Sequence, residues 1–462
     1  MAFAAVRSYF SDFKVLKDTR KEYWALQGIN VLDCTAYFAL YNVVIVSLTA
    51  DFGFTDVQAG YTYTLFSSAT TLFLFFSGLL TDWLGIKKSL YISIIGLMVL
   101  RVLVVVAAQL PEGSMKSYTV VGALFAMAPF MAMLQTLFQS ANKRFTTTKS
   151  RGAGFNLWYL FMNVGAAIGG FVVDIFYLQL GLPRYHIFSL GVVTGALCIL
   201  VTYFLIKRTE QLQSGDEVDD PKALPLQLED EQKKKNPWQI AREVLSHSSF
   251  WRFVTLITLL IGVQAVFLYL GLLHPLFWLR VIGPDANIGA LQALNPIIVI
   301  IGLLLLIPIL GRFNIYSMLI LGAFINSIAM FIIAIPPAAG SDVGQFTYIT
   351  TILFLVLLTV GEVIWSPRLQ EYTAAIAPAG QEGTYFGLSM VPYFMAKSMI
   401  GLLSGHMLNR WCPEGIGDRL RAGTVAYSDS PYMMWMVLGV FALGGTLAAY
   451  LLKGWFTRGL PK

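Results

Sequence analysis

Uninterrupted apolar runs, each about 20 residues long, recur along the chain and are separated by short polar connections. A helix needs about 20 apolar residues to cross the hydrocarbon core of a bilayer, whereas the strands of a membrane barrel would alternate in polarity. The pattern therefore predicts an all-α membrane protein with about twelve transmembrane helices in two six-helix halves. The first six are expected near 22–48, 56–80, 89–109, 117–140, 152–178 and 184–206, and the second six near 250–281, 286–310, 315–335, 345–368, 381–408 and 431–453.

A polar stretch at 207–249 separates the two halves, and its acidic and lysine-rich clusters are typical of a solvated linker. Apolar residues also recur at helical spacing among the lysines and arginines of the first residues, which fits a helix on the membrane surface as well as a frayed tail. The predicted domains are an amphipathic or cytoplasmic N-terminal segment at 1–21, a six-helix bundle at 22–206, the cytoplasmic linker at 207–249, a second six-helix bundle at 250–455 and a C-terminal tail at 456–462.

Charge is distributed unequally between the two sets of connections. Lysines and arginines concentrate in alternate connections, as at Lys87, Lys88 and 143–151, while the opposite connections carry acids such as Glu112 and Asp342. Basic connections of membrane proteins face the cytoplasm. We therefore expect an integral, multi-pass protein of the cell membrane (an inner or plasma membrane), with its N and C termini in the cytoplasm.

Composition narrows the class of protein further. Charged residues make up 13% of the chain and hydrophobic residues 56%, whereas soluble proteins carry about 25% charged residues. The 3 cysteines and 4 histidines are scattered, so the sequence predicts no metal site and no cofactor. The net charge of +6 arises mainly in the basic connections and does not indicate nucleic-acid binding. An enzyme would need a cluster of catalytic groups, and the sequence shows none, so no enzymatic activity is expected.

One short connection carries a recognisable motif. Between the second and third apolar runs stand Gly78, Asp82, Gly85, Lys87 and Lys88, in the spacing G-x-x-x-D-x-x-G-x-K-K. Glycines permit close helix packing, and lysines suit the headgroup region. This segment resembles the loop between the second and third helices of the major facilitator superfamily. The resemblance implies solute transport by two six-helix halves around a central site, with Asp82 as a gating or packing residue.

Further segments are similar to the proton-dependent oligopeptide transporters, the peptide-carrying branch of that superfamily. The fifth run carries Trp158, Tyr159, Asn163, Gly165 and Ala166, matching the family's aromatic pair, asparagine and small residues. Gly165 and Gly169 also form a small-xxx-small face for close helix packing. Two later segments, at 291–298 and 361–367 with the following 377–387, resemble the family's eighth, tenth and eleventh helices.

The first helix departs from that family. Its usual E-x-x-E-R-F is replaced by a run in which Asp33 is the remaining acid and Cys34 stands at the arginine position. Leu134 occupies the place of the family's fourth-helix lysine, and the family's seventh-helix acid is absent, with Gln264, His274 and Arg280 as the polar groups there. The departures leave open whether the substrate is a peptide.

Ionisable side chains inside apolar runs mark candidate site residues, because each costs about 2.5–3.5 kcal/mol at a helix centre. The resemblance implies that Glu362 faces the substrate cavity. Lys397 either binds a substrate carboxylate or pairs with Glu362, and Asp33 is either a cavity or a structural residue. His274 either titrates or makes a plain polar contact, and Arg101 is expected to be structural. The predicted substrate-binding residues are Tyr37, Trp158, Asn163, Glu362 and Lys397, and those for proton coupling are Glu362 and Asp33.

Together these features predict a secondary active transporter that works by alternating access. The resemblance implies symport with protons of a small polar organic solute, such as a di- or tripeptide or a peptide-like zwitterion. The alternatives are a transporter of a non-peptide solute (an amino acid derivative, a carboxylate or a drug) and a transporter-like receptor that moves nothing. The expected partners are the small-molecule substrate, protons and the lipid bilayer, and the chain is expected to be a monomer.

Overall fold

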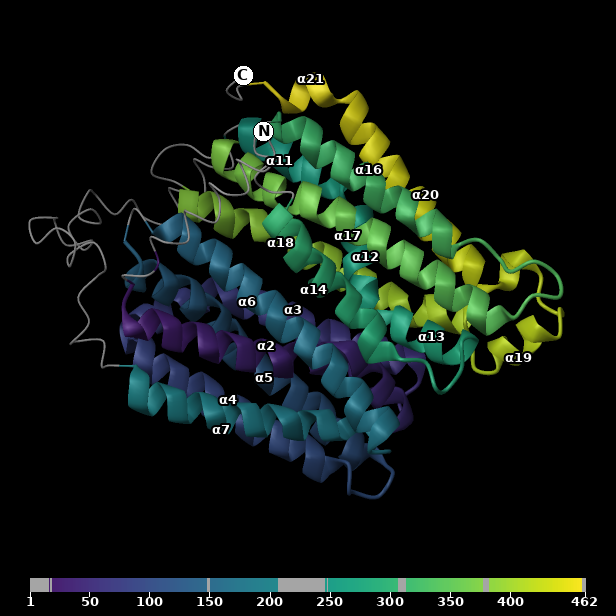
Figure 1. The fold of residues 1–462 in the computed structure, drawn as a ribbon, viewed down its shortest axis with the longest axis horizontal. Helices are drawn as coiled ribbons and strands as arrows, with labels where there is room; N and C mark the ends of the chain where they lie inside the picture. Colours follow the sequence, from purple (N-terminus) through teal and green to yellow (C-terminus); the bar gives the residue numbers. More distant parts are fainter. Residues whose placement is uncertain are drawn as a thin grey trace, which may run out of the picture. The chain divides into compact units, whose positions relative to one another are not determined.

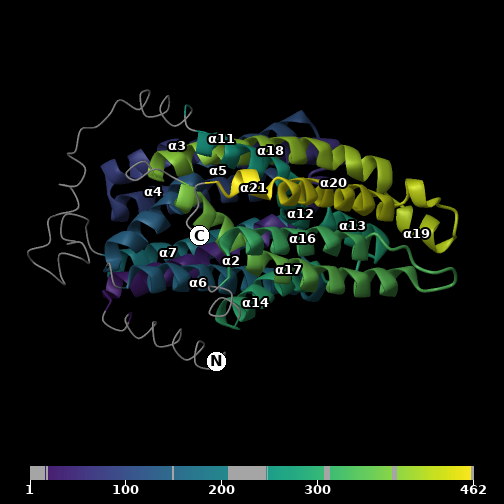
Figure 2. The same ribbon diagram turned by 90° about the horizontal axis from the view of Figure 1, so that it is seen from above.

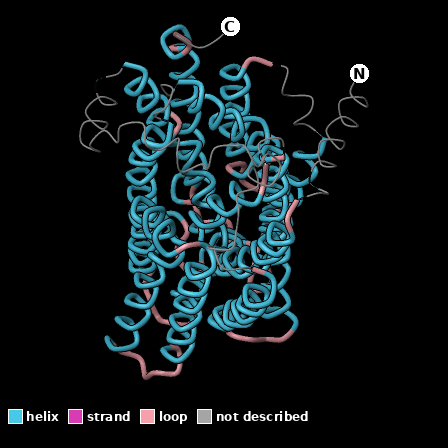
Figure 3. The backbone as a smooth tube through the Cα atoms, turned by 90° about the vertical axis from the view of Figure 1, so that its left-hand side faces the viewer, coloured by secondary structure: helices cyan, strands magenta, loops and turns pink. Residues whose placement is uncertain are grey.

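The computed structural model describes residues 19–147, 150–206, 248–305, 313–376 and 382–458, together with Leu16 and Ser246. Across these residues the chain consists of helices joined by loops, and no strand occurs among them (Figure 3). Most of the predicted surface segment 1–21, most of the linker 207–249 and the end of the tail lie outside the described residues. The residues divide into two compact units, one made of Met1–Tyr41 and Leu65–Lys235, the other of Asn42–Thr64 and Asn236–Lys462.

The first unit is built mainly from the helices that precede the linker. Within it, α4 packs against α5 and α7, and the three run side by side in Figures 1 and 2. Helices α2 and α3 contribute to both units, because each unit takes one part of each of them. The bounds are α2 Lys21–Ala50, α3 Asp56–Leu84, α4 Ile86–Ala107, α5 Ser114–Phe145, α6 Arg151–Asp174 and α7 Ile187–Leu205.

The second unit has its core where α16 packs against α17 and α20 (Figure 1). Buried aromatic side chains such as Phe253, Tyr316, Trp365 and Tyr372 fill this core. The bounds are α11 Ser248–Leu259, α12 Ile261–Leu272, α13 His274–Val281, α14 Ile288–Leu305, α16 Ile315–Ile333, α17 Val343–Ile376, α18 Glu382–Trp411, α19 Ile416–Arg421, α20 Pro431–Leu451 and α21 Lys453–Phe456.

The predicted seventh span is a broken helix rather than a continuous one. Its first two pieces, α11 and α12, are bent by 52° relative to each other, and a second break at Leu273 separates α12 from α13. Pro275 lies in the first turn of α13, where its missing N–H removes no helical hydrogen bond. A Cβ at Gly262 would lie 2.6 Å from the Cα of Ala442, so α12 also approaches α20 closely after the bend.

The helices are long and apolar enough for a membrane. Nine helices in the described part of the chain meet that criterion, and the bent pair α11–α12 would add a tenth. Two more, α3 and α18, are 29 and 30 residues long. Large apolar side chains are widely exposed, among them Val99 at 61%, Phe204 at 73% and Phe441 at 58%. Such a surface suits hydrocarbon, since a soluble protein rarely exposes extended apolar patches.

Candidate functional site

The clearest candidate site lies in the second unit, around the carboxylate of Glu362 near the middle of α17. Asn295 on α14 donates a 2.7 Å hydrogen bond from Nδ2 to Oε2 of Glu362, and a 3.0 Å bond to the hydroxyl of Thr359. Thr359 in turn donates to the carbonyl of Leu355 within α17. The polar partners of Glu362 are therefore neutral, and a carboxylate there keeps its charge uncompensated by a cation among the described residues.

Local packing explains why Glu362 is turned toward α14. A Cβ at Gly322 on α16 would lie 2.7 Å from the carbonyl oxygen of Gly361, so α16 and α17 touch at this point. Successive helical residues are separated by about 100° around the axis, since a turn takes 3.6 residues. Glu362 follows Gly361 directly and so lies on a different face. In the predicted motif, Gly361 therefore allows α16 to pack closely against α17, while Glu362 accepts a hydrogen bond from Asn295.

Lys397 lies on α18, and its side chain is partly buried. No ion pair or side-chain hydrogen bond of Lys397 occurs among the residues that the structure describes, and in particular none with Glu362. The alternative in which the two residues pair with each other is therefore not formed in this structure. Neither side chain is engaged in an ion pair among the described residues.

In the first unit, α2 and α6 approach each other closely at the small-residue face predicted from the sequence. A Cβ at Gly165 would lie 2.7 Å from the Cβ of Cys34, and one at Gly169 would lie 2.6 Å from the carbonyl oxygen of Thr35. Nearby, Asn30 donates a 3.0 Å hydrogen bond to the carbonyl of Trp158. The motif on the fifth run is thus a helix-packing device as well as a candidate site.

Three predicted substrate residues occupy this region of the first unit. Asn163 is buried and donates to the carbonyl of Tyr159 in its own helix at 2.9 Å. The indole nitrogen of Trp158 is buried without a hydrogen-bond partner. Tyr37 is partly buried and its ring stacks on that of Tyr41. The Trp158 nitrogen therefore still has a hydrogen bond to donate.

Asp33 forms no ion pair among the described residues, although the charge of a buried cation acts on it. It is partly buried on α2 and interacts electrostatically with Arg101 of α4. Arg101 is itself buried and donates from Nη1 to the carbonyl of Gly191 on α7 at 2.9 Å. A Cβ at Gly191 would meet the Arg101 side chain at 2.6 Å, so a larger residue there would displace that side chain. Arg101 joins α4 to α7, which agrees with its predicted structural role.

The loop motif forms a sharp junction between α3 and α4. Gly78 and Asp82 lie in α3, and the side chain of Asp82 falls outside the described residues. Gly85 adopts a positive φ of 78° and precedes α4, a conformation that glycine adopts without strain. Lys87 donates to the carbonyls of Tyr203 and Ile206 at 3.3 and 2.6 Å. Lysine is thereby used to cap the C-terminus of α7, where cations are favoured, while Lys88 is exposed.

One ion pair was not anticipated from the sequence. Within the second unit, Arg280 of α13 binds Asp56 at the start of α3 with two hydrogen bonds of 2.8 Å, and also donates to the carbonyl of Cys412 at 2.7 Å. The side chains are only 9% and 13% exposed. The one available signal was an arginine at the end of an apolar run that carries no acid.

His274, which the sequence left open, makes a polar contact inside an aromatic cage. It is fully buried, its Nδ1 lies 3.0 Å from the carbonyl oxygen of Tyr269, and its ring stacks on Phe354 with Trp435 beside it. Among the described residues, no three histidine, cysteine, aspartate or glutamate side chains are grouped as metal ligands would be.

Comparison with known proteins identifies the family. The family model of the Major Facilitator Superfamily matches residues 28–402, and the chain belongs to this superfamily of membrane transporters. No curated protein matches the sequence. Solved structures, however, match along almost its whole length, and all those compared below are peptide-transporter folds.

A mutant of the peptide transporter POT in complex with sulfate has a TM-score of 0.71 at 14% identity, covering 96% of each chain. A structure described under substrate recognition in proton dependent oligopeptide transporters has a TM-score of 0.69 at 16% identity, covering 95% of this chain and 99% of the other. A POT family transporter in complex with 5-aminolevulinic acid has a TM-score of 0.70 at 13% identity, covering 95% and 97%. The chain shares its fold with these three transporters, and the low sequence identity fits a divergent member of the superfamily.

Proposed function

We propose that this chain is a secondary active transporter that moves a small polar zwitterion together with protons by alternating access. The observation that supports the proposal is Glu362, an acid near the middle of an apolar 34-residue helix whose hydrogen-bond partner is the neutral amide of Asn295. An acid at such a position is costly, and in membrane proteins it usually marks a pathway for protons or substrate. Exchange of its proton would add or remove a full charge inside the second unit.

Lys397 supports the choice of a zwitterion. Its ammonium has no anionic partner among the described residues, so a substrate carboxylate would relieve the cost of burying it. The similar solved structure that contains 5-aminolevulinic acid holds a ligand with one carboxylate and one amine. A compound of this kind, or a short peptide, has the charges that Lys397 and an acid would select. Asp33 remains a candidate for the amine, although Arg101 competes for it.

The experiment is uptake by the purified protein in proteoliposomes, with dialanine and 5-aminolevulinic acid as probes. We expect an inward proton gradient to drive accumulation by the natural protein. Glu362→Gln should abolish accumulation and retain counterflow exchange, because the amide oxygen can still accept a hydrogen bond from Asn295 but the amide cannot take up or release a proton. Asp342→Asn is the matched control: Asp342 precedes α17 and accepts a hydrogen bond from the backbone of Gln345, which asparagine can also do. It should leave accumulation unchanged.

A second variant tests the binding role of Lys397. Lys397→Ala should raise KM for each carboxylate probe at least tenfold and leave uptake of a dipeptide amide, which has no carboxylate, unaffected. Accumulation by Glu362→Gln at the natural level would contradict the coupling role. Uptake of neither probe would contradict the substrate class. Binding of a probe without any flux would favour the transporter-like receptor, for which a thermal shift with ligand is the direct measurement.

The first helix lacks most of the family's E-x-x-E-R-F motif, and this favours a second candidate function, the transport of a non-peptide solute. Asp33 is the remaining acid of that motif, and it interacts with Arg101. A peptide needs several anchoring groups along its backbone, whereas an amino acid derivative or a simple carboxylate needs fewer. Saturable uptake of 5-aminolevulinic acid with no competition by dialanine would select this non-peptide alternative.

We also infer that the chain works as a monomer with both termini in the cytoplasm.

A further inference from the structure

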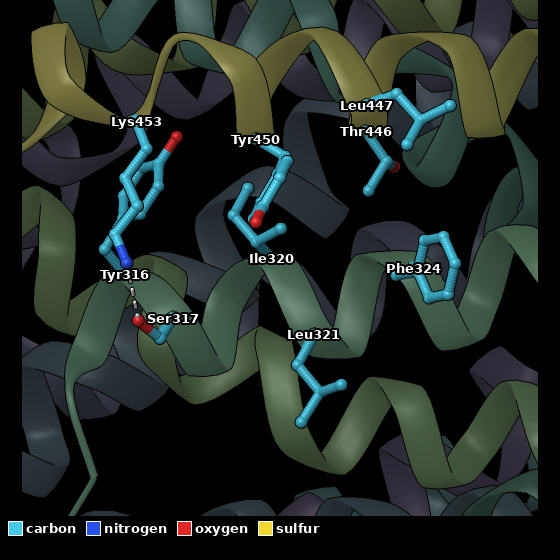
Figure 4. A pocket seen from close by; sticks show the side chains of 9 residues that line it. All are labelled: Tyr316, Ser317, Ile320, Leu321, Phe324, Thr446, Leu447, Tyr450 and Lys453. Atoms are coloured by element: carbon cyan, nitrogen blue, oxygen red, sulfur yellow. Dashed lines mark hydrogen bonds between the residues drawn. The ribbon is translucent and has the colours of Figure 1, made fainter.

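A hollow of about 360 Å³ lies in the second unit between α16 and α20. It is placed at the end of the pair where α16 begins and α20 passes into α21. Figure 4 shows its lining: Lys453 and Ser317 are together at one end, Tyr450 is in the middle, and Leu447 and Phe324 are toward the other end. The charged group is thus at one end of the hollow, and the rest of the lining is mainly apolar, interrupted by the hydroxyls of Tyr450 and Thr446.

The hollow opens on a surface suited to lipid. Leu321, Phe324, Leu447 and Tyr450 are 44%, 38%, 44% and 58% exposed in the whole chain. From Ser317 to Phe324 a helix advances about 10 Å, which is less than the roughly 15 Å of one leaflet of the hydrocarbon core. The length of the groove therefore suits part of one acyl chain, beginning at the level of the headgroups.

The polar end carries an available positive charge. The Nζ of Lys453 lies 3.4 Å from the hydroxyl of Ser317, and Lys453 is exposed. No carboxylate pairs with it among the residues described. Ser317 lies in the first turn of the 19-residue helix α16, where the helix dipole adds to the positive potential. An anion at this end would gain from both.

We propose that this groove binds an anionic phospholipid, with one acyl chain between α16 and α20 and the headgroup phosphate at Lys453 and Ser317. The order of groups along the groove matches that of a lipid. Its phosphate would lie at the helix ends beside Lys453 and Ser317, and its acyl chain would lie along the apolar side chains of α16 and α20. A phosphatidylcholine would place a cation near Lys453 and gain less. A second copy of this chain would cover the apolar part but would leave the lysine without a partner.

The test uses the purified full chain and two photoactivatable lipids, phosphatidylglycerol and phosphatidylcholine, each with a diazirine in one acyl chain. We expect phosphatidylglycerol to label residues of α16 and α20 that border the groove, and unlabelled phosphatidylglycerol to compete better than phosphatidylcholine. Lys453→Ala should weaken phosphatidylglycerol labelling about fivefold, equivalent to the ~1 kcal/mol of one basic residue at a charged membrane surface. Labelling by phosphatidylcholine should not change.

Three variants make the result specific. Lys453→Arg should retain the preference, and Leu447→Trp should reduce labelling by both lipids because it fills the groove. Lys88→Ala removes an exposed lysine at the start of α4, outside the groove, and should have no effect. All the replaced side chains are exposed, so folding should survive, and the melting temperature verifies it. Unchanged labelling of Lys453→Ala, or labelling that maps to other helices, would overturn the proposal.

Discussion

Carboxylates within the long helices have very different surroundings. Asp56 is bound by the guanidinium of Arg280 through two hydrogen bonds, and Asp33 interacts with Arg101. Glu362 has the neutral amide of Asn295 instead. A buried charge with an opposite partner can persist as part of the structure, whereas one without such a partner is costly. Asp56 is therefore held in a structural ion pair, whereas Glu362, bound by a neutral amide, carries the proposed coupling role, with Asp33 as the second candidate for it.

The Asp56–Arg280 pair gives a stability prediction at the residue scale. Arg280→Ala should destabilise the protein by about 3–5 kcal/mol, because the Asp56 carboxylate stays buried without its partner. Exchanging the two charges, with Asp56→Arg and Arg280→Asp together, should recover part of that loss. Thermal unfolding of the purified variants measures both.

An exposed pair on the same chain is the control. Arg410 and Asp429 are joined at 2.6 Å, but their side chains are 61% and 45% exposed. Arg410→Ala should cost less than about 1 kcal/mol, since solvent screens such pairs. Equal losses for Arg280→Ala and Arg410→Ala would show that the buried pair has no special role.

At the scale of elements, glycines decide how closely neighbouring helices pack. Gly169 brings α6 against the backbone of α2 at Thr35. Gly169→Ala should destabilise by about 1–3 kcal/mol through overpacking, even though alanine is the better helix former by about 1 kcal/mol. The control is Gly122→Ala on α5, where a Cβ would meet nothing within 4 Å. That change should be neutral or slightly stabilising, and similar melting temperatures for the two variants would refute the close α2–α6 contact.

The seventh span differs from the single helix that its sequence predicts. Its apolar run at 250–281 predicts one helix, and the structure has three pieces, with a bend of 52° between the first two. Pro275 marks the last break, but nothing in the run marks the first at Leu260. Beyond that break, Gly262 fits against Ala442 of α20, a contact between residues far apart in sequence. The bend is thus associated with tertiary packing that the local pattern does not contain.

At the scale of the whole molecule, the predicted orientation in the membrane can be tested. Single cysteines would be introduced at Lys88 and at Glu112 in a background without Cys34, Cys198 and Cys412. Both sites are accessible: Lys88 is exposed, and the Glu112 side chain is 74% exposed. An impermeant maleimide should label Glu112→Cys in intact cells and Lys88→Cys only after permeabilisation, because basic connections stay in the cytoplasm. The opposite pattern would invert the predicted topology.

The sequence by itself determined the class of fold and the approximate location of its helices, apart from the breaks in the seventh span. A membrane helix satisfies its backbone hydrogen bonds within its own segment, so a local apolar run of sufficient length is enough to predict it. For the same reason the Gly165–Gly169 face and the intramembrane Glu362 were recognisable one segment at a time. The superfamily, indicated by the loop motif, is confirmed by the family match over residues 28–402.

Only the tertiary structure decided which side chains meet. Asp56 and Arg280 are 224 positions apart, and Asn295 was only one of several polar residues until α14 was placed beside α17. Lys397 was expected either to pair with Glu362 or to stay available, and the structure leaves the two unpaired. The groove at Lys453 exists because α16 and α20 are neighbours. Such contacts depend on the rotation and depth of each helix, which are set by packing between distant segments and leave no signal in either segment alone.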